Sequence, residues 1–280
     1  AGSCPKIFIT ALAVSARSIG LSKDSDDTLR AMKKIGPSQS ISWVSKLLVG
    51  SLLSSGILIS VAAPAHAVLA PISLGAADSF AVLAGGAITN TAPTGNTLVN
   101  GDLGTYPNAA TFLGATSATI SGTNYGASAT AQSAQTSLAA ANAAITALPA
   151  GSTLIATMSG TLNPGVHDQV SAVSLATTLT FDGQGDSSSV FVIRVVGAMT
   201  TAAASSVILL NGAQSSNIFW KITGATTLGA GSTFRGNLLG AGAITVGAGT
   251  VVDGRLLTEL GALTMASNTI TKPASAPTSY

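Results

Sequence analysis

The sequence predicts a mainly β fold in which short strands coil into a solenoid, with one long α-helix beside it. The segment 227–236 (TLGAGSTFRG) recurs as 245–254 (TVGAGTVVDG), and more loosely again at 264–271. Repeats spaced by roughly 20 residues are typical of stacked coils. Charged residues make up 8% and aromatic residues 4% of the 280-residue chain, which disfavours a salt-bridged helix bundle. Only one segment has clear helical periodicity.

Residues 1–67 differ in charge from the rest of the chain. They hold seven Lys or Arg against three Asp, whereas residues 68–280 hold five against seven, so the main body has no basic patch for nucleic acid. Residues 32–67 begin with Met-Lys-Lys, become uncharged and apolar from Leu47, and end in Ala-His-Ala67, the three parts of a secretory signal peptide. We expect cleavage after Ala67, secretion, and no stable membrane association afterwards.

An uncleaved membrane anchor is the alternative for this segment, because about 17 apolar residues can just span a bilayer. Its serines, its glycines and the Ala-His-Ala end favour cleavage. Residues 1–31 precede Met32 and show no clear periodicity. We interpret them as upstream or leader sequence.

Residues 68–280 are long enough to form one domain with a continuous core. Cys4 is the single cysteine, so neither a disulfide nor a cysteine metal site is expected in this domain. The segment 92–116 is rich in Pro, Gly and Asn and has few strand signals. We expect it to cover one end of the solenoid, where unpaired strand edges would otherwise be exposed.

One amphipathic helix is predicted at 127–148. Apolar residues recur there at alternating spacings of four and three, from Ala127 to Leu148, and Pro149 ends the helix. About 21 helical residues span roughly 32 Å, which matches about six coils stacked at about 4.8 Å. The helix can therefore run along the whole solenoid.

The remaining apolar segments are short and are separated by turn residues such as Gly-Asp, Asn-Gly and Asp-Gly. They predict short strands, which continue into the C-terminal repeats. The expected strands lie at 81–83, 118–120, 178–181, 190–195, 207–210 and 217–222.

Several motifs occur in the order in which they occur in one protein family. The longest are LGAADSFAVLAG at 74–85, LTFDGQGD at 179–186 and NIFW at 217–220, and shorter ones include NGDLG, LNPGV, VFVI, NGAQ, GNLL, DGRLL and NTITKP. Over about residues 72–273 the chain resembles the secreted ice-binding proteins of cold-adapted microbes. The resemblance implies a right-handed, discontinuous parallel β-helix of triangular cross-section with a helix alongside, in which N-terminal chain forms a rung among the C-terminal rungs.

The resemblance also implies a function. Proteins of this family adsorb to ice crystals through one flat face and slow ice growth and recrystallisation. For this chain the expected partner is thus an ice surface. A monomer that needs no metal and no cofactor is expected.

The ice-binding face is predicted from the alternation of side chains along each strand. In 244–247 (ITVG) the apolar side chains point inward and the threonine points outward, with a small residue two positions on. The resulting uncharged column is the predicted site: Thr180, Thr201, Thr227, Thr245 and Thr264, flanked by Ala203, Gly229, Gly247 and Ala266. A second phase-matched column is the reserve choice: Ser206, Ser232, Thr250 and Thr269. The alternative is that threonine merely suits the solvated face of a sheet.

Two other function classes compete with ice binding. An enzyme could use Asp168 beside His167, the pair Asp182 and Asp186, or the group Asp253, Arg255 and Glu259, but no hydrolase, phosphate-loop or metalloprotease motif is present, and no catalytic residues are expected. Asp182 and Asp186 bracket glycines, which favours a turn over a calcium site.

A secreted adhesin or glycan-binding surface protein without ice activity is the alternative function. Sugar sites commonly display exposed aromatic side chains, whereas Trp220 lies in an apolar strand and is expected in the core.

Overall fold

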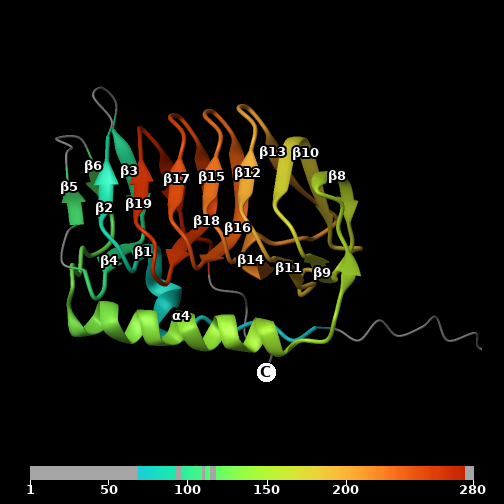
Figure 1. The fold of residues 1–280 in the computed structure, drawn as a ribbon, viewed down its shortest axis with the longest axis horizontal. Helices are drawn as coiled ribbons and strands as arrows, with labels where there is room; N and C mark the ends of the chain where they lie inside the picture. The colour runs from blue at the N-terminus through green and yellow to red at the C-terminus, as the bar shows by residue number, and fades with distance from the viewer. Residues whose placement is uncertain (1–68, 92–95, 109–110, 114–117, 275–280) are drawn as a thin grey trace, which may run out of the picture. The chain divides into compact units, whose positions relative to one another are not determined.

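The computed structural model describes residues 69–91, 96–108, 111–113 and 118–274, which all belong to one compact unit, Ala65–Tyr280. The expected signal peptide and the segment 1–31 lie outside the described residues. The described part is a parallel β-helix with α4 (Ala129–Ala147) beside it (Figure 1). The predicted fold class is confirmed.

The strands stack into three faces, and the pairings between the described strands are all parallel. The first face contains β8 (Thr157–Leu162), β10 (Val173–Asp182), β12 (Met199–Thr201), β15 (Thr226–Leu228), β17 (Ile244–Val246), β19 (Leu263–Met265), β2 (Ile88–Asn90) and β5 (Thr111–Leu113), in this order.

The second face contains the later parts of β8 and β10, then β13 (Ser206–Leu210), β16 (Thr233–Gly240), β18 (Val251–Thr258), β20 (Thr269–Thr271), β3 (Thr97–Asn100) and β6 (Ala118–Ile120). The third, which we call the helix face, contains β7 (Ser152–Thr153), β9 (Gly165–Gln169), β11 (Phe191–Val195), β14 (Ile218–Ile222), the later parts of β16 and β18, β1 (Phe80–Ala84) and β4 (Asp102–Thr105).

Two long strands turn the corner between the second face and the helix face. In β16, residues 233–235 lie on the second face and 237–240 on the helix face, with Gly236 between them. Gly254 occupies the same place in β18, and a Cβ there would lie 1.9 Å from the Gly236 carbonyl oxygen. Stacked corners of this shape therefore require glycine.

The chain order of the coils is discontinuous, as the resemblance implies. The first coil stacks on the last one, because Leu83 pairs with Leu257, Thr89 with Thr264 and Val99 with Ile270. The second coil, formed by β4, β5 and β6, stacks on the first coil. The chain then passes through α4 to the far end and winds back (Figure 1).

The segment 92–116 differs from the expected irregular cap. It contains β3, β4 and β5, which are hydrogen-bonded into the three faces. Residues 92–95, 109–110 and 114–116 lie outside the described residues. Gly and Asn here serve turns between very short strands, so the strand signal in the sequence is weak.

The helix α4 lies close to the expected 127–148. Ser128 caps its first turn by accepting a hydrogen bond from the Ala131 amide. Its buried apolar residues follow the predicted spacing: Ala131, Ala134, Leu138, Ala141 and Ile145. They pack against apolar side chains of the helix face and its flank: Phe80, Leu83, Val190, Val192, Phe219, Leu239 and Leu257. Among the described residues, no helix has both the length and the apolar character that a membrane span requires.

A second apolar cluster fills the interior of the solenoid. Trp220 is fully buried there, with its ring centroid 5.5 Å from that of Phe181 at 90° and its Nε1 donating to the Arg235 carbonyl at 3.0 Å. The expectation that Trp220 belongs to the core is confirmed.

Arg255 links the N-terminal coil to the C-terminal strands. Its side chain is 1% exposed and donates to Asp78 Oδ1 at 2.7 Å and to Asn237 Oδ1 at 2.8 Å. It also donates to the Asp78 carbonyl from Nε at 3.0 Å. Burial lowers the pKa of Arg255, and the Asp78 charge opposes this shift.

Replacement of the Arg255 side chain should destabilise the stacking of the first coil on the last coil. Arg255→Met leaves the Asp78 and Asn237 acceptors without their donor, so we expect the free energy of unfolding to fall by about 3 kcal/mol. Arg235→Met is the matched control, because the side chain of Arg235 is 33% exposed and lies 3.7 Å from Asp253, and it should cost less than about 1 kcal/mol. Chemical denaturation measures both; equal losses would contradict the assignment.

Candidate functional site

The first face carries one six-residue pattern in five of its coils. The pattern is Gly-Ala, an inward residue, Thr, a second inward residue, and a final small residue or Thr. It occurs at 86–91 (GAITNT), 197–202 (GAMTTA), 224–229 (GATTLG), 242–247 (GAITVG) and 261–266 (GALTMA). The coil at 171–176 (SAVSLA) is a variant of it.

Strand pairing brings the hydroxyl residues of these coils into one outward column. Ser174 pairs with Thr157 and Thr200, and Thr227 pairs with Thr200 and Thr245. The column, which we call the threonine column, runs Thr157, Ser174, Thr200, Thr227, Thr245, Thr264 and Thr89. At about 4.8 Å per strand its six intervals span about 29 Å.

Small residues or threonine flank six of the seven members of this column on both sides, whereas Ile155 lies two positions before Thr157. Two positions before it stand Ala172, Ala198, Ala225, Ala243, Ala262 and Ala87, and two positions after it stand Ala176, Ala202, Gly229, Gly247, Ala266 and Thr91. We call the three columns together the threonine face. None of these positions holds a charged residue, and the residues between them, such as Ile244 and Val246, are buried.

The edges of the threonine face are flat because glycines stack at one corner. A Cβ on Gly242 would lie 2.7 Å from the Gly224 carbonyl, and one on Gly261 would lie 2.2 Å from the Gly242 oxygen. Side chains are therefore excluded from these glycine positions, so none protrudes between the first of the three columns and the residue that precedes each glycine.

Buried polar side chains hold the other edge. Thr201 Oγ1 accepts a hydrogen bond from the Gly229 amide at 2.9 Å, and Thr250 Oγ1 donates to the Gly229 carbonyl at 2.9 Å. Asn268 Nδ2 donates to the Gly247 carbonyl at 2.7 Å. These bonds satisfy corner peptide groups from inside the solenoid, so the backbone below the face has few alternative positions.

A family described as ice-binding-like matches residues 82–271 of this chain. The chain belongs to this family. It is 34% identical over 200 residues to an ice-binding protein of Nostoc sp. (strain HG1), covering 70% of this chain and 72% of that protein. It is 36% identical over 114 residues to ice-binding protein 1 of Shewanella frigidimarina (strain NCIMB 400), covering 40% of this chain and 13% of that much longer relative.

A solved structure of an ice-binding protein from an Antarctic biological consortium has the same fold. It superposes with a TM-score of 0.70 at 34% sequence identity, covering 74% of this chain and 93% of that one. Family membership and architecture thus agree.

In this ice-binding-like chain, part of the predicted column lies in the threonine column. Thr227, Thr245 and Thr264 lie in the threonine column, and Gly229, Gly247 and Ala266 flank it. The C-terminal sequence repeats determine these positions, because residues at the same place in neighbouring repeats pair with each other and so align in one column.

Three predicted positions lie outside the threonine column. Thr201 is 4% exposed and points inward, because Thr200 rather than Thr201 pairs with Thr227. Ala203 lies in the following turn, and Ala202 takes its expected place. Thr180 lies on the second face opposite Ile208, because β10 continues past the corner.

The reserve column is not a column. Ser232 and Thr250 are buried at the corner between the first and second faces, 2% and 0% exposed. Ser206 and Thr269 lie on the second face, where the residues between them are Thr233 and Val251. The reserve choice combined two phases that differ by one residue.

Sequence reasoning missed much of the threonine face. Thr89 and Ala87 come from the inserted N-terminal coil, and Thr157, Ser174 and Thr200 come from coils whose lengths differ from those of the C-terminal repeats. The Gly-Ala-x-Thr pattern was a readable signal, since it occurs at 86–89 and 197–200 as well as in the obvious repeats.

The rival acidic and histidine groups are engaged in structural contacts at separate places. Asp168 is bidentate with Arg194, at 2.6 Å to Nε and 2.7 Å to Nη2, and this hydrogen-bonded pairing lowers the pKa of Asp168. His167 Nδ1 lies 2.8 Å from Ser152 Oγ and Nε2 lies 2.8 Å from the Asn163 carbonyl. Burial lowers the pKa of His167.

The remaining acidic residues are also bonded to neighbours. Asp182 accepts from the Gln184 amide and from Asn211 in a turn, Asp253 accepts from Ser215, and Glu259 accepts from Asn142. Over the described residues, no cluster of three or more His, Cys, Asp or Glu could hold a metal ion.

The register of the threonine column can be checked by paired substitutions. Thr201→Val removes the acceptor for the Gly229 amide in a buried position, so we expect it to lower the free energy of unfolding by about 1 to 2 kcal/mol. Thr200→Val, at the adjacent exposed position, should change it by less than about 0.5 kcal/mol. Urea denaturation of both variants distinguishes the two registers, because the opposite order of losses would place Thr201 outside.

Proposed function

We propose that this protein binds ice through the threonine face and thereby slows ice growth and recrystallisation. The observation that carries the proposal is the threonine column: seven hydroxyl residues aligned over consecutive coils, without a charge and, except for Ile155 beside Thr157, flanked by small residues or threonine. The proposed ice-binding residues are those of the threonine column and its flanking columns. They replace Thr180, Thr201 and Ala203 of the predicted site.

The chemistry of this face suits ordered water. Threonine hydroxyls can donate to and accept from lattice water, while their methyl groups and the neighbouring alanines restrict freely mobile hydration. Each contact is weak, so affinity depends on many contacts formed together. A face already fixed by backbone pairing loses little conformational freedom on binding.

The other two faces are less suitable. The second face carries the ion pair of Arg235 and Asp253 and the exposed side chain of Ile208, which interrupt its threonines. The helix face is covered by α4. A flat crystal surface would meet charges on one and a helix on the other.

In this proposal the protein acts as a secreted monomer, without catalysis and without a metal or cofactor. The signal-peptide pattern supports secretion. It implies a mature chain that begins at Val68, which intact-mass measurement of the secreted protein checks. A mature protein that still begins at Met32 would refute the cleavage.

A bulky residue in the threonine column should abolish binding to ice. Thr245→Tyr places an aromatic ring in the middle of the flat surface, and we expect thermal hysteresis to fall to less than about a tenth, because contacts on either side can no longer form together. Thr180→Tyr is the matched control on the second face and should retain full activity. Circular dichroism should show both variants folded.

Partition into a slowly growing ice hemisphere tests the function itself. We expect the unmodified protein to be incorporated into the ice. Its exclusion would favour the adhesin or glycan-binding alternative. Loss of activity in Thr180→Tyr with full activity in Thr245→Tyr would instead move the site to the second face.

A further inference from the structure

Exposed aliphatic side chains gather at one edge of the threonine face. Of the seven large apolar residues that are exposed in the described chain, four lie on that face or beside its glycine corner: Ile155 at 65%, Val170 at 82%, Val196 at 60% and Leu260 at 78% exposure. The other three, Ile208, Leu210 and Val251, lie on the second face. Ile155 stands two positions before Thr157 and so continues the alanine column.

Val170 and Val196 belong to a further column at the corner between the helix face and the first face, and Leu260 lies at the same corner. Each stands four positions before a hydroxyl residue of the threonine column. The backbone ladder continues through the first four of these coils, since the Val196 amide donates to the Gln169 carbonyl and the Thr223 amide donates to the Val195 carbonyl. In the next coil Glu259 lies in register with Ala241, and Leu260 follows it. We call these five residues the corner ridge: Val170, Val196, Thr223, Ala241 and Leu260.

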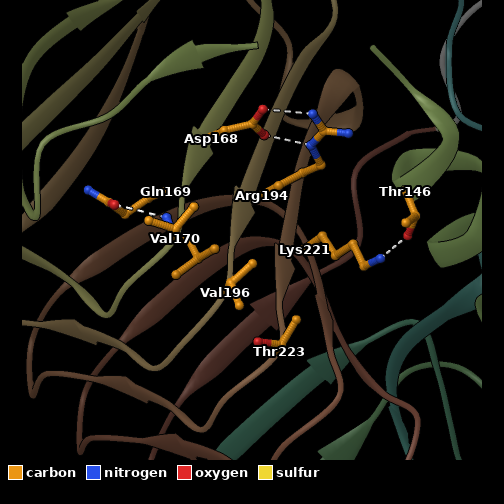
Figure 2. Close-up of a pocket in the computed structure, with 9 residues that line it drawn as sticks. Thr146, Asp168, Gln169, Val170, Arg194, Val196, Lys221 and Thr223 are labelled. Carbon is orange, nitrogen blue, oxygen red and sulfur yellow. Dashed lines mark hydrogen bonds and ion pairs between the residues drawn. The ribbon is translucent and has the colours of Figure 1, made fainter. Parts of the chain in front are cut away.

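The charges nearest the corner ridge are directed away from it. Asp168, Arg194 and Lys221 each stand two positions before a ridge residue, and they face the end of α4 (Figure 2). Arg194 donates to the carbonyls of Ile145, Leu148 and Pro149 as well as to Asp168.

Lys221 likewise donates to the Asn142 carbonyl and to Thr146. Cations at a helix C-terminus are stabilised by its carbonyl groups. A hollow of about 290 Å³ lies between these groups and Val170, Val196 and Thr223. Glu259, which precedes Leu260, accepts a hydrogen bond from Asn142 of α4. The five ridge residues themselves are uncharged, and the charged side chains beside them bond to one another or to α4.

We propose that ice contact continues from the threonine face around the corner onto the corner ridge, so that the ligand is an ice surface with two intersecting planes, such as a growth step. This inference rests on the proposed function. The glycine corner supports it, because glycine separates the ridge from the alanine column in four coils, and only the small Ser171 separates them in the coil of Val170. Aliphatic groups at the second plane would restrict water as the threonine methyls do on the first.

A protein partner fits this edge less well than ice does. A stable protein interface buries about 800 Å² on each partner. The ridge is one residue wide at a corner, and two of its five members are Thr223 and Ala241. Its continuity with the proposed ice-binding face favours one shared ligand.

A charged side chain on the ridge tests the proposal. Val196→Lys should reduce thermal hysteresis to less than about a third, because one plane of a jointly bound surface is lost, while incorporation into ice persists through the threonine face. Leu260→Lys should act in the same way at the other end. Val251→Lys is the matched control, because Val251 is 45% exposed on the second face, and it should leave hysteresis unchanged.

The set of bound planes gives a second readout. On a single-crystal ice hemisphere, fluorescently labelled unmodified protein should bind two sets of planes, and Val196→Lys should bind one of them. Unchanged hysteresis and planes in both ridge variants, with activity abolished in Thr245→Tyr, would overturn the ridge alone. Unchanged activity in Thr245→Tyr would overturn the proposed face.

Self-association is the remaining outcome, and sedimentation velocity measures it. If the unmodified protein is a dimer that Val196→Lys dissociates, the ridge is a contact between copies and the inference is wrong. A monomer in both forms, with reduced hysteresis in the variant, supports ice contact at the ridge.

Discussion

The parallel backbone ladder between consecutive coils is the constraint on which the rest of the structure depends. Because each coil hydrogen-bonds to the next in register, side chains of equal phase recur at one spacing of about 4.8 Å. The face that results is a product of pairing and needs no contact between the threonines themselves. The same ladder accepts N-terminal chain, because Thr89 pairs with Thr264 as Thr245 does on its other side. A strand needs the right register, and its origin in the sequence is immaterial to the face.

Side-chain size decides how closely the coils can follow one another. Gly224, Gly242 and Gly261 at one corner, and Gly236 and Gly254 at another, occupy positions where a Cβ would meet neighbouring atoms at less than ordinary contact distance. The same restriction that permits stacking also flattens the edge of the threonine face. Small residues thus serve the fold and the proposed binding surface by one mechanism.

Most of the few charged residues of the domain connect one structural element to another. Arg255 connects the first coil to the last strands, Arg194 and Lys221 cap the end of α4, and Arg235 pairs with Asp253 on the second face. The threonine face is left without ions, which would hold water too strongly in their own hydration shells to match a lattice. The low charge of the domain is therefore most complete on the threonine face, the surface that meets the proposed ligand.

The sequence alone determined the solenoid, the long helix and the C-terminal coils that repeat at a nearly constant period. Periodicity of this kind depends only on the spacing of residues along the chain, so it can be read without the tertiary structure. It therefore located Thr227, Thr245 and Thr264 with their flanking small residues. Only the tertiary structure decided that Thr200 replaces Thr201, that Thr180 belongs to another face, and that Thr89, Ser174 and Thr157 complete the column. A shift of one residue turns a side chain from solvent to core, and where coil lengths vary, only hydrogen bonding between distant strands sets that register.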